Sequence, residues 1–147
     1  MTSVLYVEDE EDDVYFMRQS FRQAGLERCL RVAVNGQEAM DYLSGRGRFG
    51  NRVEYPIPAV VLLDLNLPIL PGFHVLKWIR EQAQFRELPV IIFSSSSRRE
   101  DRLKAEEFGA TDYLEKPGSG LEFSTVVEAL VKRWLKQANV DVVAGGA

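Results

Sequence analysis

The sequence holds a single cysteine, Cys29, and a single histidine, His74. One cysteine cannot form an internal disulfide, which suits a reducing compartment. A structural zinc site needs about four ligands, mostly cysteine or histidine, so this class of site is excluded. His74 falls in an expected helix and is interpreted as a surface or packing residue rather than a phosphodonor.

Long apolar segments and an excess of basic residues are also missing. No apolar run reaches the roughly 18–20 residues that span a bilayer, and the N-terminus has no signal-peptide pattern. The net charge is −4, whereas nucleic-acid-binding domains are usually basic. We therefore expect a cytoplasmic protein that binds neither membrane nor nucleic acid. Arg46, Arg48 and Arg52 could form an RNA-like patch, but a solvated, partner-facing loop is the better interpretation.

The 147 residues suffice for one domain with a sizeable core but not for two ordinary domains. We expect a single domain over residues 1–138, followed by a disordered tail over 139–147. Within the domain, short apolar runs alternate with helical patterns. The expected strands cover residues 3–7, 29–34, 59–64, 89–93 and 112–114. The expected helices cover residues 14–24, 37–43, 73–83, 98–108 and 121–137.

Five strands that are each followed by a helix predict a doubly wound α/β fold, in which a parallel sheet is covered on both faces. Functional groups of such folds gather beyond the carboxyl ends of the strands. The polar residues that follow the strands are Glu8, Asp9, Asp64, Ser94 and Lys116. We expect them along one edge of the sheet.

The stretch LYVEDEEDD over residues 5–13 runs from an apolar strand into consecutive acids. Three converging carboxylates, Glu8, Asp9 and Asp64, need positive charge among them to stay ionised. Mg²⁺ together with Lys116 would balance their charge, and waters on the metal could give way to a phosphoryl group. The remaining acids, Glu10 to Asp12, are interpreted as a solvated helix start and Asp13 as a helix cap. Without the other matching residues, Asp64 could equally be interpreted as the cap of the helix that follows it.

Asn66 bears on what chemistry Asp64 would perform. An aspartyl phosphohydrolase of the haloacid dehalogenase type places an acid two residues after its nucleophile to drive hydrolysis. This chain has Asn66 at that position. A phosphoaspartate at Asp64 would therefore be stored rather than rapidly turned over.

Four motifs in order carry a family resemblance: VEDE at 7–10, LLDLNLP at 62–68, IIFSS at 91–95 and YLEKP at 113–117. The chain resembles the receiver domain of two-component response regulators over roughly residues 3–137. Within that family it is most similar to the small regulators paired with bacterial phytochromes. The resemblance implies a flavodoxin-like sheet with strand order 2-1-3-4-5. Departures from the family pattern are Glu8 for aspartate, Pro71 before Gly72, and Gly118 after the Lys-Pro pair.

The resemblance also implies roles for individual residues. Asp64 would be the phosphoacceptor, and Lys116 would contact the phosphate. Magnesium would be held by Glu8, Asp9, Asp64 and the backbone carbonyl of Asn66. Ser94, with Ser95 beside it, would supply the hydroxyl that moves onto the phosphoryl group, and Tyr113 would be the aromatic switch.

The last expected helix has an apolar band wider than one core-facing stripe. Phe123, Val127 and Trp134 belong to this band. The apolar residues beyond one core-facing stripe predict a homodimer surface on this helix. A well-buried terminal helix would produce the same pattern.

The expected function is that of a stand-alone response regulator, because too little sequence follows Pro117 for an output domain. A sensor histidine kinase, such as a bacterial phytochrome, would phosphorylate Asp64, and output would come from contact with another protein. No enzymatic turnover is expected. The alternatives are a Mg²⁺-dependent phosphohydrolase and an interaction module that no longer takes phosphate. A flavin-binding protein is excluded, because acids after the first strand would repel the phosphate.

Overall fold

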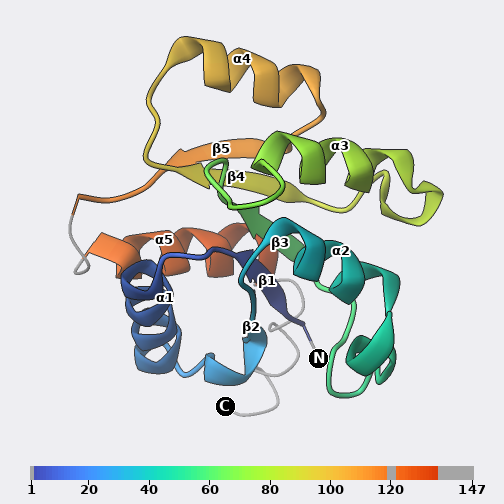
Figure 1. Ribbon diagram of the computed structural model, residues 1–147. Coiled ribbons are helices and arrows are strands. Elements are labelled where there is room, and N and C mark those ends of the chain that lie inside the picture. The colour runs from blue at the N-terminus through green and yellow to red at the C-terminus, as the bar shows by residue number, and fades with distance from the viewer. Residues whose placement is uncertain (1, 119–121, 136–147) are drawn as a thin grey trace.

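The computed structural model describes residues 2–118 and 122–135, and a five-stranded parallel sheet forms its centre (Figure 1). The strand order is β2-β1-β3-β4-β5, which confirms the flavodoxin-like order. The strands are β1 (Val4–Val7), β2 (Leu30–Ala33), β3 (Val60–Leu63), β4 (Val90–Ser94) and β5 (Asp112–Glu115). All five were predicted, with ends that differ by one residue at most.

The central strands β1, β3 and β4 are buried along their whole length. Their continuous apolar sequences fit this position, because both faces of a parallel sheet are covered by helices. Val7 is level with Leu63 in the sheet register. The residues that follow β1 and β3 are therefore neighbours at the same edge of the sheet.

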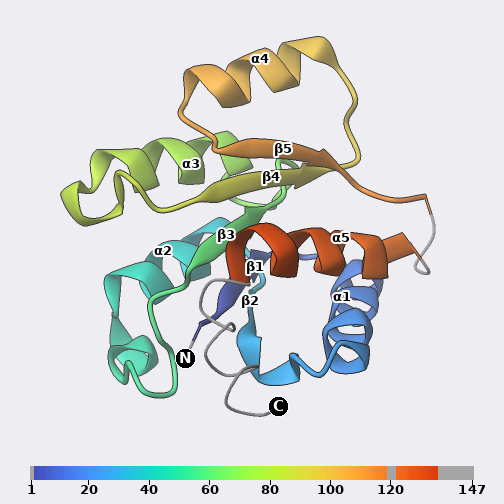
Figure 2. The ribbon, with the colours of Figure 1, turned by 180° about the vertical axis from the view of Figure 1, so that it is seen from behind.

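Within the described ranges, five α-helices cover the sheet (Figures 1 and 2). They are α1 (Glu11–Gln23), α2 (Gly36–Ser44), α3 (Gly72–Glu81), α4 (Arg99–Glu107) and α5 (Phe123–Leu130). A π-helical turn, Val131–Leu135, continues α5. The ends of the expected 121–137 helix and the expected tail over 139–147 lie outside the described residues. In the part of the chain that the structure describes, no helix is both long and apolar enough to cross a bilayer.

The helices divide between the two faces of the sheet. Helices α1 and α5 lie side by side over one face, and α2, α3 and α4 lie on the other (Figure 2). The core under α1 and α5 is rich in aromatic side chains, including Tyr6, Phe93 and Phe123. The core on the other face contains the alternate strand residues, such as Val7 and Leu63, because successive side chains of a strand point to opposite faces.

The last helix corrects one prediction. Phe123 and Val127 are each only 2% exposed and pack in the core shared with α1 and the sheet. Trp134 is partly buried against the same core. The wide apolar band of α5 is needed because this helix contacts α1 as well as the sheet. Phe123 and Val127 therefore cannot line a dimer surface of this fold, while the homodimer itself stays a prediction.

The Arg-rich connection over residues 44–58 is also more ordered than a solvated loop. A short 3-10 helix, Gly47–Gly50, buries Phe49 against Tyr42 and Tyr55. Arg52 donates hydrogen bonds to the carbonyls of Tyr42 and Leu43, each at 2.8 Å. These carbonyls lie in the last turn of α2, where regular helical partners run out, and the Tyr42 carbonyl also accepts from the Gly45 amide at 3.1 Å. Arg52 therefore acts as a cap of that helix rather than as part of a cationic patch.

Candidate functional site

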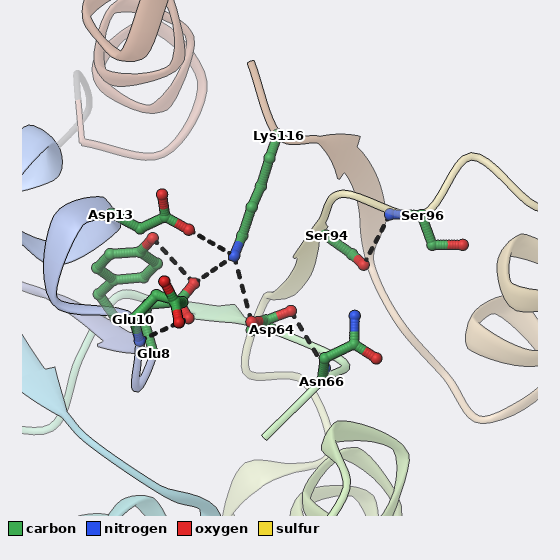
Figure 3. Close-up of polar contacts among 9 residues, drawn as sticks. Glu8, Glu10, Asp13, Asp64, Asn66, Ser94, Ser96 and Lys116 are labelled. Atoms are coloured by element: carbon green, nitrogen blue, oxygen red, sulfur yellow. Dashed lines mark hydrogen bonds and ion pairs between the residues drawn. The ribbon is translucent and has the colours of Figure 1, made fainter. Parts of the chain in front are cut away.

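The carboxyl edge of the sheet brings together side chains from three strands (Figure 3). Glu8 follows β1, Asp64 follows β3, and Lys116 follows β5. Glu8 is fully buried and Asp64 is 3% exposed. Charged side chains are rarely buried this deeply without partners, which marks this edge as the polar centre of the molecule.

Lys116 is the centre of the charge network. Its Nζ lies 2.6 Å from Glu8 Oε1, 2.8 Å from Asp13 Oδ2 and 3.2 Å from Asp64 Oδ2. Figure 3 shows the ammonium group between Asp13 and Glu8 on one side and Asp64 on the other. The structure thus confirms that Glu8, Asp64 and Lys116 meet as predicted from the strand ends.

Asp13 belongs to this charge network, although the sequence analysis did not predict a contact with Lys116. It was interpreted as the cap of the first helix, but α1 already begins at Glu11 and Asp13 lies inside its first turn. A side chain in this turn points back toward the helix N-terminus, and here it reaches Lys116. The charge balance drawn from Glu8, Asp9 and Asp64 was therefore incomplete, because Asp13 adds a fourth carboxylate.

Glu8 is held by neighbours on both of its carboxylate oxygens. The Tyr6 hydroxyl donates to Oε1 at 3.3 Å, and the Glu10 amide donates to Oε2 at 3.2 Å. Burial raises the pKa of Glu8 to about 7, with a further rise from the charge of Asp64, while Lys116 partly opposes both. Tyr6 was not singled out in the sequence, because a tyrosine within an apolar strand has the pattern of an ordinary core residue.

The contacts around Glu8 also shift the pKa values of Lys116 and Tyr6, the two side chains that donate hydrogen bonds to the buried carboxylates. Burial lowers the pKa of Lys116, but its bonds to Asp13 and Glu8 and the charge of Asp64 outweigh burial and raise it above its usual range. Burial and the nearby charge of Glu8 raise the pKa of Tyr6. Both groups therefore keep their protons throughout the physiological range, and both serve as fixed donors to carboxylates.

The backbone around Asp64 explains how its side chain is oriented. Asp64 Oδ1 accepts a hydrogen bond from the Asn66 amide at 3.2 Å, while Oδ2 faces Lys116. Helix α3 begins against this segment at Gly72. A Cβ atom added to Gly72 would lie 2.2 Å from the Asp64 carbonyl oxygen. Only glycine permits this close approach, so Gly72 allows α3 to begin directly against the segment that carries Asp64.

Glu8, Asp9 and Asp64 form an oxygen-rich group. One carboxylate oxygen from each lies within 4.8 Å of the others. Asp9 is exposed, whereas Glu8 and Asp64 are buried, and the exposed Asn66 lies beside them in sequence and space. Carboxylate and carbonyl oxygens are the ligands that hard divalent cations prefer. This donor set therefore fits the predicted metal site.

Ser94, one of the predicted switch residues, lies on the side of Asp64 away from Glu8 (Figure 3). Ser94 is fully buried at the end of β4, and its Oγ accepts from the Ser96 amide at 3.1 Å. The Tyr113 hydroxyl donates to the Ser96 carbonyl at 2.9 Å. Ser95 is exposed. In the described residues the hydrogen bonds of Ser94 and Tyr113 thus lead to the loop after β4 and not to Asp64.

Comparison with known proteins identifies the family of this chain. The family described as response regulator receiver domain matches residues 4–128. The chain belongs to this receiver family. Phosphorylation on an aspartate is the general function of receiver domains, and histidine kinases phosphorylate them. The predicted family and its parallel fold are thereby confirmed.

The chain is similar to short response regulators over nearly their whole length. Response regulator Rcp1 of Synechocystis sp. is 27% identical over 133 residues, which cover 90% of this chain and 88% of Rcp1. The crystal structure of its Mn²⁺-bound form has a TM-score of 0.80 and covers 92% of this chain and 95% of that one. Response regulator RPA3017 in red light signaling of R. palustris has a TM-score of 0.83 and 34% identity, covering 91% and 94%. The bacteriophytochrome response regulator RtBRR has a TM-score of 0.72 and 34% identity, covering 88% of this chain and 78% of that one. The predicted likeness to phytochrome-associated regulators is therefore confirmed.

Other relatives are much longer than this receiver domain. The chain matches the sensor histidine kinase CheAY of Helicobacter pylori at 30% identity but spans 15% of its length. It spans 50% of two matched transcriptional regulators. The receiver family therefore occurs both in short regulators and as one part of longer proteins.

Proposed function

We propose that Asp64 is the phosphoacceptor of a response regulator that signals by phosphorylation-dependent contact with another protein. The observation that carries this proposal is the Lys116 ammonium, 3.2 Å from the Asp64 carboxylate at the carboxyl edge of the sheet. The Lys116 cation can neutralise phosphoryl charge next to the acceptor. Asp64 is almost fully buried, so its position is set by the fold before any donor arrives.

The transfer is a displacement at phosphorus. An Asp64 carboxylate oxygen attacks the phosphorus of a phosphohistidine on a sensor kinase, and a new P–O bond forms. The P–N bond breaks, and its electron pair stays on the imidazole nitrogen, which is neutral if the ring was protonated beforehand. The product is an acyl phosphate on Asp64, and Lys116 contacts its phosphoryl oxygens.

The metal site proposed for this chemistry consists of Asp9, Asp64, Glu8 and the Asn66 backbone carbonyl. Bound Mg²⁺ would supply positive charge that stabilises the phosphoryl oxygens. Asp9 is the exposed member of the set. Asp64 belongs to both the acceptor and the metal set, so a neutral residue at this position would impair both.

The response to phosphorylation is proposed to involve the side of the site formed by Ser94, Ser95 and Tyr113. The Ser94 hydroxyl would turn from the Ser96 amide to the phosphoryl group, and Tyr113 would move into the space that it leaves. The surface around α4 and β5 would then shift between two arrangements. A sensor histidine kinase in the cytoplasm, related to the bacterial phytochromes, is the proposed donor. A homodimer through Phe123 and Val127 is not part of the proposal, because both are buried in the core.

Intact-protein mass after incubation with acetyl phosphate and Mg²⁺ tests this function. We expect one added phosphoryl group, which is lost in Asp64→Asn and after chelation with EDTA, and retained in Asp12→Asn. Steady release of inorganic phosphate that depends on Asp64, without an adduct, would favour the phosphohydrolase; Asn66 in place of an acid argues against it. No adduct and no phosphate, even with a histidine kinase supplied, would indicate an interaction module.

A further inference from the structure

The Lys116 ammonium group has no proton left for a phosphoryl oxygen. A lysine ammonium offers three N–H donors, and three carboxylates, Glu8, Asp13 and Asp64, lie within bonding distance of it. Its side chain is 10% exposed, so water has little access to it. Contact between Lys116 and a phosphoryl group on Asp64 therefore requires that one of these bonds is exchanged.

Glu8 is the partner that Lys116 is least able to leave. Its side chain is fully buried, and its other donors are the Tyr6 hydroxyl and the Glu10 amide. Because water has no access to Glu8, no solvent molecule can replace the bond that Lys116 would leave, which is unfavourable for a buried polar group. Asp64 is the acceptor itself, so the negative charge that it presents to Lys116 increases when the phosphoryl group is attached, and its link to Lys116 is kept through the phosphoryl oxygens.

Asp13 is the partner that can be released at lowest cost. Its side chain is 26% exposed, compared with 4% for Asp64 and 0% for Glu8, so water can replace the lost bond. Asp13 also lies in the first turn of α1, where the positive end of the helix dipole favours a carboxylate. Both factors stabilise an ionised Asp13 after Lys116 has left.

We propose that Asp13 is a positioning residue, which holds Lys116 by an ion pair in the unphosphorylated protein and yields it to the phosphoryl group on Asp64. This inference rests on the proposed function of Asp64. Asp13 then competes with the phosphoryl group for the same ammonium, so it weakens the phosphorylated state. The exchange also breaks a link between α1 and the segment after β5, two regions 103 residues apart in the sequence.

Beryllium trifluoride, an unreactive probe of the phosphoryl group, measures this competition by calorimetry at saturating Mg²⁺. Replacing the charged partner by a neutral one in Asp13→Asn should tighten probe binding by roughly fivefold, the difference between a charged and a neutral hydrogen bond. Asp13→Glu, which keeps the charge, should bind the probe like the wild type. Asp12→Asn is the matched control, since it removes the same charge from the same helical turn at an exposed position.

A spectroscopic measurement on the unaltered protein tests the exchange directly. The carboxyl carbon resonance of Asp13 should move when the probe binds, because its ammonium partner leaves, while that of Asp12 should stay nearly unchanged. A purely structural role of Asp13 in the α1 turn predicts no such movement.

The outcomes separate this inference from the proposed function. If the wild type does not bind the probe, or Asp64→Asn binds it equally well, the function proposed for Asp64 fails. If the wild type binds it through Asp64, the exchange is refuted by any of three results. These are unchanged or weaker binding in Asp13→Asn, an equal gain in Asp12→Asn, and an Asp13 resonance that does not respond.

Discussion

The two sides of the site are held by different kinds of contact. On the α1 and α5 side, Phe123 contacts both Phe16 and Phe93, with ring centroids 5.8 Å apart in each pair. On the other side, Ala105 is the buried residue of α4, whereas Leu103 in the same helix is 53% exposed. Burial of large aromatic side chains therefore stabilises α5, and α4 has little of it.

Helix α4 is held chiefly by charged side chains at its surface. The Arg102 guanidinium lies 4.6 Å from the Tyr113 ring centroid and 3.7 Å from Glu115. The Lys104 ammonium lies 4.5 Å from the Phe73 ring centroid and 5.7 Å from that of Phe108. Exposed contacts of these kinds contribute about 1 kcal/mol or less each.

This difference indicates which side of the molecule responds to a signal at Asp64. Lys116 and Asp13 connect Asp64 to the tightly packed α1 side, while Ser94 and Tyr113 lead to the loop before α4. Elements with few buried contacts open at lower free energy. We therefore expect phosphorylation to shift the arrangement of α4 and β5 more readily than that of α5.

The largest expected effect is the loss of packing on the α5 side. Phe123→Ala should lower the free energy of unfolding by about 4 kcal/mol, because it leaves a cavity among buried rings. Phe108→Ala at the end of α4 removes the same side chain from a half-buried position and should cost less than half as much. Urea unfolding of both variants measures the difference. Equal losses would show that the two sides are packed alike.

The titration of Glu8 is expected to have a smaller effect, a change of about 2 kcal/mol in the free energy of unfolding between pH 5 and pH 8. The unfolded chain loses this proton near the ordinary value of 4.5, whereas the folded protein keeps it up to a pKa of about 7. The folded state binds more protons between these values, so this stabilisation is complete below pH 4.5 and is lost as pH rises through 7. From pH 5 to pH 8, metal-free wild type should lose about 2 kcal/mol relative to Glu8→Gln.

Urea unfolding in EDTA at several pH values measures this loss, with Glu11→Gln as the exposed control. A wild type whose stability follows that of Glu8→Gln at every pH would contradict the raised pKa. That result would show that ionisation of Glu8 does not lower the stability of the folded protein.

The smallest expected effect concerns the contacts that hold α4. Arg102→Gln should cost about 1 kcal/mol or less in global stability. It should still speed amide hydrogen exchange in α4 by roughly fivefold, since that helix has few other contacts. Exchange in α5 should be unchanged. Arg99→Gln is the matched control, because Arg99 is exposed in the same helix. An equal increase in amide exchange in α4 and α5 would contradict the difference in packing between the two sides of the site.

Several features of this protein were readable from the sequence alone. Continuous apolar runs predict the central strands, because strands buried on both faces need no polar alternation. The residues that follow those runs, including Glu8, Asp64 and Lys116, were expected at one edge because parallel strands end together. Such predictions depend on local patterns and on a topology that few folds can satisfy.

Other features were decided by the tertiary structure. Ile69 adopts a left-handed backbone, with φ of 70° and 81% of its side chain exposed, although isoleucine has no preference for this conformation. The burial of Phe123 depends on α1 lying beside α5. The pairing of Asp13 with Lys116 depends on where α1 begins and on a strand order that brings distant segments together. Local sequence patterns report a residue's own conformation and periodicity, whereas its partners across the chain depend on the packing of the whole domain.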